Sequence, residues 1–422
     1  MALADRYERG SALSRRPGTP RLLRQLNDRA ALELLLSRGP LTRAELGALT
    51  GLSKVTSGQL LWRLEQRGLV TVAGERPGGR GPNAALYTVV ASSAYAVGLE
   101  VLPGSVTAGV ADITGRTVAE VTVRGGDGHD PVTAVHDAVR RACETAHITL
   151  PRLRAFVIGT RGVVDPATGE VRFSFDLPAW HLGALTELRT SLGPCVIIEN
   201  DVNLAAVAER SHGAARGVDD FVLLWTGVGQ GLGVMLEGRL HRGATGGAGE
   251  VGWLPVPGEP LPADVTEPQS GSFQRLVGGQ AVISLAAAHG LLDSPGRGRI
   301  DMDHLERGRP GTDQVGDIGA IVRRAVASGA DAFLDELAMR LAVGVAAVSV
   351  VLDPGLVVLS GDAGRAGGPT LAARVERAVA RICPSRPRVA VTEVTGNPIL
   401  RGAMVIALGH AREEVFATTV DA

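Results

Sequence analysis

The hydrophobic pattern of this 422-residue chain changes between residues 90 and 95. Before that point apolar residues recur at helical spacing and lead into two short β-rich runs, whereas strand-like runs alternate with helical segments after it. A chain of this length exceeds what one hydrophobic core normally holds. We therefore predict two domains, at 20–90 and 94–422, with a charged, flexible segment at 1–19 before them.

The first domain begins with two predicted helices. Helical periodicity runs from Pro20 to Arg38, and a second helix follows Thr42, because Thr42 and Glu45 have the spacing of a capping box. Gly51 then allows a tight turn. The apolar positions expected to face the core of these helices are Leu22, Leu26, Ala30, Leu34, Leu35, Leu46 and Leu49.

A third helix is predicted to run from Ser53, a good N-cap residue, to Arg67. Two helices joined by a glycine-containing turn, with the second one longer, are typical of a helix-turn-helix. The β-rich runs at 69–72 and 85–90 flank a Gly/Pro/Arg turn at 75–82 and predict a hairpin, which would be the wing of a winged helix. The positions expected to be buried on the third helix are Val55, Leu60, Leu61 and Leu64.

Polar and basic side chains gather where a winged helix would contact a duplex. The N-terminal part of the third helix offers donors and acceptors for base edges and phosphates, and the wing offers arginines for a minor groove. Gly58 costs that helix about 1 kcal/mol relative to Ala, and either permits close approach to DNA or only lowers affinity. The alternative is a packing module that binds no nucleic acid. The candidate DNA contacts are Arg43, Ser53, Lys54, Thr56, Ser57, Gln59, Arg76 and Arg80.

The net charge of −1 conceals an asymmetry between the two predicted domains. Residues 1–90 contain 14 Lys and Arg against 7 Asp and Glu, a net charge of +7. Residues 91–422 contain 29 basic and 37 acidic residues, a net charge of −8. A basic head on an acidic body favours double-stranded DNA as the partner of the head, although a solvated charged face has the same composition.

Three segments of the second domain carry candidate chemistry. Residues 199–201 (Glu-Asn-Asp) follow a predicted strand, where they either bind hydroxyl groups, with Asp201 as a general base, or cap the next helix. The glycine-rich segment 226–231 either exposes amides to phosphate or forms a plain turn. The segment 246–253 places Glu250 among glycines, in a loop that binds a ligand or is simply flexible. The residues alone leave these alternatives open.

Composition disfavours several other classes of protein. Cys143, Cys195 and Cys383 show neither a CxxC motif nor the spacing of a zinc site. The longest uncharged apolar run, 341–352, is too short to span a bilayer, and residues 1–16 lack the apolar core of a signal peptide. We therefore expect a cytoplasmic protein with no membrane contact, no metal and no cofactor.

From about residue 20 to residue 410 the chain resembles the ROK family, named for repressors, open reading frames and kinases. The segment LTRAELGALTGLSKVTS is similar to the winged helix of its sugar-responsive repressors, and GVVDPATGEV, TGVGQGLGVMLEGRLHRGATGGAGEVGWLPV and VVLDPGLVVLSG are similar to its body. The resemblance implies an α/β, actin-like body of two ribonuclease-H-like subdomains with sugar in the cleft. The ligand contacts that it implies are Gly162, Asn200, Asp201, Glu250, Trp253 and Gln274.

Two departures from the family's kinases bear on catalysis. The kinases have a D-x-G-G-T phosphate loop, but here Leu102 and Pro103 replace the glycines, and proline has no amide to offer a triphosphate. The family's zinc motif should fall between residues 252 and 274, where this chain has no cysteine and has Trp253 at the His position. Trp253 either stacks on a sugar ring or fills the vacated space. Asp201 matches the family's catalytic base, but we expect it to be vestigial.

These observations predict a non-catalytic transcriptional regulator, in particular a repressor, whose operator binding is modulated by a sugar or a related metabolite. A homodimer or homotetramer is expected, because paired half-sites on DNA require two heads. One alternative is an active sugar kinase, which ATP turnover would reveal. The other is a regulator that uses its body only for dimerisation, and it would not release its operator on addition of any ligand.

Overall fold

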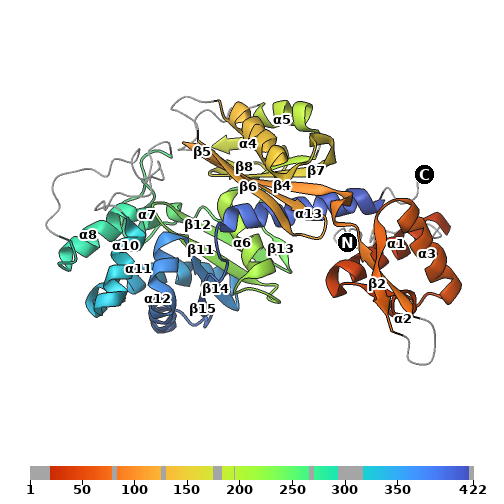
Figure 1. Ribbon diagram of the computed structural model, residues 1–422. Helices are drawn as coiled ribbons and strands as arrows, with labels where there is room; N and C mark the ends of the chain where they lie inside the picture. Colours follow the sequence, from red (N-terminus) through yellow and green to blue (C-terminus); the bar gives the residue numbers. More distant parts are fainter. Residues whose placement is uncertain are drawn as a thin grey trace, which may run out of the picture. The chain divides into compact units, whose positions relative to one another are not determined.

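The computed structural model describes residues 20–77, 83–124, 130–173, 183–193, 195–265, 270–292 and 317–417. The chain divides into two compact units, one formed by Met1–Ala94 with Ala411–Ala422 and the other by Tyr95–His410 (Figure 1). The C-terminal residues thus group with the N-terminal unit, whereas the sequence pattern placed everything after residue 94 in the body. The predicted flexible segment at 1–19 lies outside the described residues.

The described part of the N-terminal unit is a helix-turn-helix followed by a β-hairpin. Its elements are α1 (Pro20–Arg38), β1 (Leu41–Thr42), α2 (Arg43–Thr50), α3 (Lys54–Gln66), β2 (Val70–Arg76), β3 (Ala84–Val89) and η1 (Ala91–Ser93). The strands form an antiparallel sheet in the order β1-β3-β2. The capping box of Thr42 and Glu45 and the N-cap at Ser53 form as predicted, and Gly51 ends α2 in the left-handed region. The predicted winged helix is therefore confirmed.

Helix α1 buries Leu35 as predicted, but the rest of its buried face differs from the prediction. Leu22 and Leu26 are 46% and 54% exposed, and Leu49 of α2 is 42% exposed. The charged residue Asp28 lies on the buried face because its carboxylate accepts a hydrogen bond of 2.6 Å from Arg63 of α3. The buried set has the i, i+3, i+4, i+7 spacing of one helix face and consists of Asp28, Ala31, Leu32 and Leu35.

Helix α3 likewise differs from the prediction at its N-terminus. Val55, which we expected in the core, is 69% exposed, and Ser57 is only 2% exposed. The Ser57 hydroxyl donates to the backbone oxygen of Ser53 and packs beside Gly47, where an added Cβ would lie 3.0 Å from it. The buried face therefore begins at Ser57 and continues, as predicted, through Leu60, Leu61 and Leu64.

The body is built on two five-stranded sheets. The strands of the first are β4 (Tyr95–Leu102), β5 (Ser105–Asp112), β6 (Thr117–Arg124), β7 (Leu153–Thr160) and β10 (Val196–Asn200). Those of the second are β11 (Phe221–Thr226), β12 (Gln230–Leu236), β13 (Arg239–Leu240), β14 (Leu356–Ser360) and β15 (Arg388–Val391). A separate ribbon pairs β8 (Val163–Val164) with β9 (Val171–Phe173).

Both five-stranded sheets have the same topology. Their orders are β10-β7-β4-β5-β6 and β13-β12-β11-β14-β15. In each sheet the first three strands form an antiparallel meander, and the last two lie parallel to the first strand. This repeated order confirms the predicted pair of ribonuclease-H-like subdomains.

Helices separate and cover the two sheets (Figure 1). They are α4 (Pro131–Ala146), η2 (Leu150–Arg152), α5 (Ala184–Leu192), α6 (Asp201–His212), η3 (Val251–Trp253), α7 (Ser272–Val277), α8 (Gly279–Ala288), α10 (Ile318–Ser328), α11 (Asp331–Leu352), α12 (Gly361–Ile382) and α13 (Pro398–Ala417). Helix α4 packs on the first sheet, α13 packs on the opposite face of that sheet, and α6 lies against both α13 and the second sheet. The pair α6 and α13 therefore forms the layer between the sheets.

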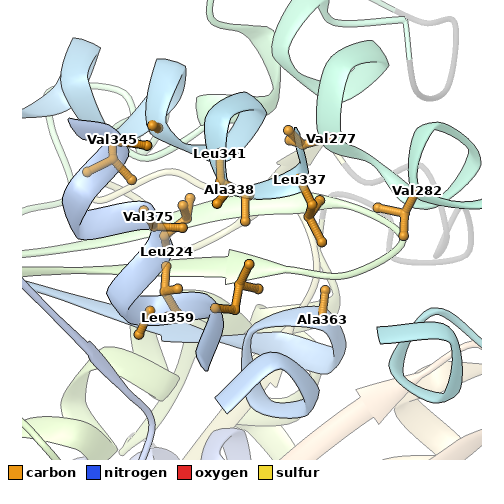
Figure 2. Close-up of a cluster of buried hydrophobic side chains, with 14 of the residues drawn as sticks. Leu224, Val277, Val282, Leu337, Ala338, Leu341, Val345, Leu359, Ala363 and Val375 are labelled. Atoms are coloured by element: carbon orange, nitrogen blue, oxygen red, sulfur yellow. The ribbon is translucent and has the colours of Figure 1, made fainter. Parts of the chain in front are cut away.

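The second sheet is buried on both faces. Along β11, Val222 and Leu224 point toward the helices α11 and α12, and Phe221 and Leu223 point toward α6, as the two-residue period of a strand requires. Figure 2 shows Leu224 and Leu359 of neighbouring strands meeting side chains of α11 and α12. The apolar run 341–352 forms the C-terminal half of α11, and within the described ranges no helix is both long and apolar enough to cross a membrane.

Glycine determines how closely α13 approaches α6. A Cβ on Gly402 of α13 would lie 1.9 Å from the carbonyl oxygen of Leu204 on α6, so Gly402→Ala must push the two helices apart. We expect this substitution to lower the free energy of unfolding by about 3 kcal/mol. The matched control is Gly409→Ala on the same helix, where no atom lies within 4 Å and helix propensity predicts a gain of about 1 kcal/mol. Thermal unfolding of both variants tests this; equal midpoints would contradict the packing argument.

Candidate functional site

Most of the predicted DNA contacts on the helix-turn-helix lie at its surface. Ser53 and Thr56 are exposed and share a hydrogen bond of 2.9 Å between their hydroxyls at the start of α3. The burial of Ser57 corrects the expectation that its hydroxyl reaches DNA, because that side chain belongs to the core face of α3. The exposed members of the set are Arg43, Ser53, Lys54, Thr56 and Gln59.

Two open hollows meet at these basic residues. One, of about 440 Å³, lies over α3 and is lined by Arg43, Lys54, Val55, Gly58, Gln59 and Trp62. The other, of about 740 Å³, lies between α2 and the wing strand β3, and its lining includes Asn83 and Tyr87. Arg43 and Lys54 line both hollows, so the positive charge is concentrated where helix and wing come together.

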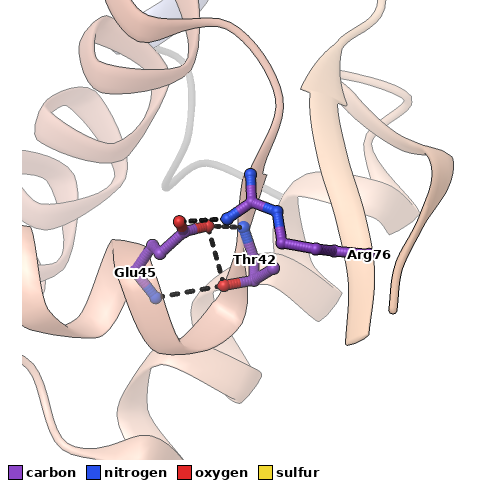
Figure 3. Close-up of polar contacts among 3 residues, drawn as sticks. All are labelled: Thr42, Glu45 and Arg76. Atoms are coloured by element: carbon purple, nitrogen blue, oxygen red, sulfur yellow. Dashed lines mark hydrogen bonds and ion pairs between the residues drawn. The ribbon is translucent and has the colours of Figure 1, made fainter. Parts of the chain in front are cut away.

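Arg76 is engaged within the winged helix (Figure 3). Its guanidinium forms an ion pair with Glu45, whose other carboxylate oxygen accepts hydrogen bonds of 2.8 Å and 2.9 Å from the backbone N–H and the hydroxyl of Thr42. The bonds from Thr42 and from Arg76 hold the pKa of the Glu45 carboxyl below its usual value. Glu45 therefore caps α2 and ties it to the wing. Arg80 lies outside the described residues.

In the body, Asn200 performs the helix-capping role that the sequence left open. Its side-chain oxygen accepts from the backbone N–H of Asn203 at the start of α6, and its Nδ2 donates to the backbone oxygen of Gly162 at 3.0 Å. Asn200 thus holds the turn after β7 against the end of β10. Asp201 begins α6, and its Oδ1 accepts from the backbone N–H of Val202 at 2.8 Å.

Glu199 is a buried carboxylate at the end of β10 that bonds to α6 and to Arg242. It is 3% exposed, and one carboxylate oxygen accepts from Asn203 Nδ2 at 2.9 Å while the other accepts from Arg242 Nε at 2.6 Å. Sequence reasoning missed Arg242, because no spacing rule connects a residue of the β13 hairpin with a strand end 43 positions earlier. Glu199 is therefore occupied within the protein, whereas its neighbour Asp201 is half-buried.

The charge of Asp201 acts on two further carboxyl groups, those of Glu100 and Glu250, and we call these three residues the carboxyl cluster. Burial, together with the charge of Asp201, raises the pKa of Glu250 to about 7. Burial and the same charge raise the pKa of Glu100, against the effects of a 2.5 Å hydrogen bond from Asn397 and the positive charge of Arg161. Glu250 can therefore exist as a hydrogen-bond donor or as an acceptor near neutral pH.

The glycines near Glu250 fit the protein's own backbone. Gly246 and Gly249 have φ angles of 84° and 101°, and a Cβ on either would lie 2.0 Å from the carbonyl oxygen of Val164 or Leu232, respectively. Both glycines thus pack against the backbone of neighbouring strands, which disfavours the flexible-loop interpretation of this segment. The glycines hold Glu250 in place.

Gln274 supports the second glycine-rich segment, 226–231. It is 8% exposed, its Oε1 accepts from the backbone N–H of Gln230 at 3.0 Å, and its Nε2 donates to the backbone oxygen of Val228 at 2.6 Å. These bonds direct the amide at the protein backbone, and the predicted ligand contact of Gln274 stays a prediction. Trp253 is half-buried and ends η3, three residues after Glu250.

Arg161 is a second residue that sequence reasoning missed. It precedes Gly162 in the turn after β7, and its charge acts on Glu100 of the first sheet and on Asp362, at the start of α12 beside the second sheet. Burial and Asp317 raise the pKa of Asp362, while Arg161, Arg323 and Arg365 lower it. The only sequence signal was an arginine directly after a buried strand.

The zinc motif of the family's kinases maps to residues 252–274 of the body. Among the residues that the structure describes, no group of three or more His, Cys, Asp or Glu side chains has an arrangement that could hold a metal ion. Within the described residues, Cys143, Cys195 and Cys383 form no disulfide bond with one another. Part of the corresponding interval, 266–269, lies outside the described residues.

The comparison with known families agrees with this architecture. A model described as the ROK family matches residues 97–409. The chain belongs to the ROK family. Relatives of this ROK chain include the xylose repressor of Caldicellulosiruptor bescii, which is 25% identical over 240 residues, 56% of this chain and 60% of the repressor. The chain thus matches less than two thirds of the length of that repressor.

Kinases and regulators are both similar to this ROK protein. The glucokinase of Thermotoga maritima is 29% identical over 292 residues, which cover 66% of this chain and 86% of the kinase. Among solved structures, a ROK family transcriptional regulator described as a homologue of the Escherichia coli MLC protein has a TM-score of 0.67 at 17% identity. That match covers 94% of this chain and 99% of the regulator and supports the fold.

The raised pKa of Glu250 predicts a pH-dependent stability. The folded state favours the protonated carboxyl, so its contribution is complete below the ordinary pKa of 4.5 and is lost as the pH rises to about 7. We therefore expect Glu250→Gln to gain stability over the wild type between pH 5 and pH 8, measured as the difference in thermal midpoint. Asp201→Asn, which removes the neighbouring charge, should shift this transition to lower pH. Parallel wild-type and Glu250→Gln profiles would exclude the raised pKa.

Proposed function

We propose that this protein is a DNA-binding transcriptional regulator, specifically a repressor, whose operator affinity is modulated by a sugar or sugar-like ligand. The observation that carries the proposal is the exposed face of α3, where Lys54, Gln59 and the neighbouring Arg43 lie beside a wing in a ROK family chain. The name of the xylose repressor supports the same function. Two such heads in a homodimer or homotetramer would contact paired half-sites about one helical turn apart.

DNA binding is tested first, with duplexes selected from random sequence at low salt. Arg43→Ala and Lys54→Ala should each weaken binding to every duplex and reduce the slope of log affinity against log salt by about one, because each removes a phosphate contact. The matched control is Arg140→Ala on α4 of the body, an arginine whose side chain is 56% exposed. An unchanged slope in the first two variants, or no binding by the wild type, would refute the proposal.

The carboxyl cluster is the proposed ligand site. Asp201 and Glu250 are held by short backbone contacts and by packed glycines, and together they offer acceptors and one donor to the hydroxyl groups of a sugar. Glucose, xylose and N-acetylglucosamine are the first compounds to try, by thermal shift with Glu250→Ala as the control. Xylose and glucose come from the names of the relatives, and N-acetylglucosamine from a repressor that is 23% identical.

A non-catalytic body is part of the proposal. Strands β4 and β5 are joined by a two-residue turn at Pro103-Gly104, with Leu102 paired to Ser105, so the segment corresponding to the kinase phosphate loop is a tight hairpin. The glucokinase relative favours the second candidate function, a sugar kinase that uses Asp201 as its base. Phosphorylation of any of the three sugars above the rate of Asp201→Asn would support the kinase.

One helix contributes residues to both units and offers a route from ligand to DNA. Asn397 donates to Glu100 of the carboxyl cluster at 2.5 Å, and its Oδ1 accepts from the backbone N–H groups of Ile399 and Leu400 in the first turn of α13. Helix α13 then continues to Ala417, and its last residues group with the winged helix. A ligand that displaces Glu100 would therefore act on the start of this helix.

The effect of Asn397 on release by the ligand can be measured separately from its effect on operator affinity. Asn397→Ala removes the bond to Glu100 and the cap of α13, so we expect operator affinity to change less than threefold while release by the active sugar is largely lost. Anisotropy titrations of the operator with and without that sugar measure both quantities. Asn397→Asp keeps the oxygen that caps α13 but loses the amide that donates to Glu100. It therefore distinguishes the effect of losing the cap from the effect of losing the contact with Glu100. Full release by Asn397→Ala would eliminate this route.

A further inference from the structure

The exposed face of α3 carries an apolar pair that neither the fold nor the charge pattern uses. Val55 is 69% exposed and Trp62 is 62% exposed, although both residues lie on a helix whose opposite face is fully packed. They are seven positions apart, so they share a face with Gly58 and Gln59, which lie between them. All four residues line the hollow of about 440 Å³ over α3.

We propose that Val55 contacts the C5-methyl group of a thymine in the major groove and is thereby a sequence-determining residue of the operator half-site. This inference rests on the proposed function, since it assigns a base to the same surface. Val55 is the second residue of α3, and the first residues of a recognition helix are those that reach base edges. Of the four bases only thymine presents a methyl group there, and a branched apolar side chain is suited to it.

The neighbours of Val55 favour DNA over another apolar partner. Arg43 and Lys54 flank it in the same hollow, and both are exposed cations that suit phosphates on either side of a groove. The same surface of a second copy would bring like charges together around a small apolar contact, which opposes a symmetric interface. Charge complementarity therefore points to the duplex as the occupant.

Gly58 and Gln59 extend the same contact along the helix. A Cβ on Gly58 would lie 3.5 Å from the guanidinium of Arg43, an ordinary contact, so the glycine is not required by the fold and leaves the face open between Val55 and Trp62. Gln59 lies one turn beyond Val55 and has the amide that pairs with adenine. Trp62 lies about 10 Å beyond Val55 along the helix axis, where its indole N–H suits a phosphate. A half-site with a thymine close to an adenine follows from this order.

Replacing thymine by deoxyuridine removes the methyl group and nothing else, and it provides the test. The full-length protein selects a duplex from random sequence at low salt, and that duplex is then remade with deoxyuridine at one thymine at a time. Loss of a buried methyl contact should weaken binding about fourfold at one thymine of each half-site. Val55→Ala should bind the thymine duplex and the deoxyuridine duplex with equal affinity. Val72→Ala, the same change at an exposed position of β2 outside the hollow, should keep the fourfold difference.

Each outcome has a defined meaning. A fourfold loss for the wild type and for Val72→Ala, absent in Val55→Ala, establishes the contact. Tight binding that is indifferent to every deoxyuridine, or an equal loss in Val55→Ala, overturns the inference and leaves DNA binding intact. If Val55→Ala changes the oligomeric state and loses as much affinity as the wild type on deoxyuridine replacement, this face is a protein interface. Failure of the wild type to bind any duplex would refute the proposed function itself.

Discussion

The packing of α6 against α13 is the contact on which the rest of the body depends. Gly402 lets the two helices approach until its Cα faces the carbonyl of Leu204, and Gly159 of the first sheet lies against Leu204 and Ile399 of the same pair. The first sheet packs on α13 through Gly98, Gly109 and Gly159, and the second sheet packs on α6, so this single layer joins the two repeated subdomains. It also sets the position of the site, because α6 begins at Asp201 and Asn397 precedes α13.

The carboxyl groups near the N-terminus of α6 differ in how their negative charges are balanced. Glu199 has a partner in Arg242, so its charge is balanced within the protein. Glu250 is instead half-buried, and desolvation together with the charge of Asp201 makes its ionisation unfavourable until about pH 7. Under the proposed function, a neutral polyhydroxylated ligand suits such a site better than an anionic one, because hydroxyl groups can donate to Asp201 and either donate to or accept from Glu250. A phosphorylated ligand would add negative charge to a region that already disfavours it.

The sequence predicted those features that local rules determine. The capping box, the turn at Gly51, the wing and the strand runs of the body all follow from residues within a few positions of one another. The predictions failed where a distant partner decides the outcome. Asp28 lies on the buried face of α1, where it pairs with Arg63, 35 positions away, and no local rule predicts this pair. Gly246 and Gly249 could be interpreted as part of a flexible loop because their backbone partners, Val164 and Leu232, are distant in the sequence.

The same distinction explains why the DNA-binding face differs from its prediction. Helix α3 buries Ser57 with Leu60, Leu61 and Leu64, and the Ser57 hydroxyl packs beside Gly47, where an added Cβ would lie 3.0 Å from it. Once that face is fixed, helical geometry turns Val55 outward with Gln59 and Trp62. Glu45 then holds α2 to the wing through Thr42 and Arg76, so the outward face and the hairpin form one surface (Figure 3). An apolar residue on that surface is therefore a consequence of core packing and a candidate determinant of specificity at the same time.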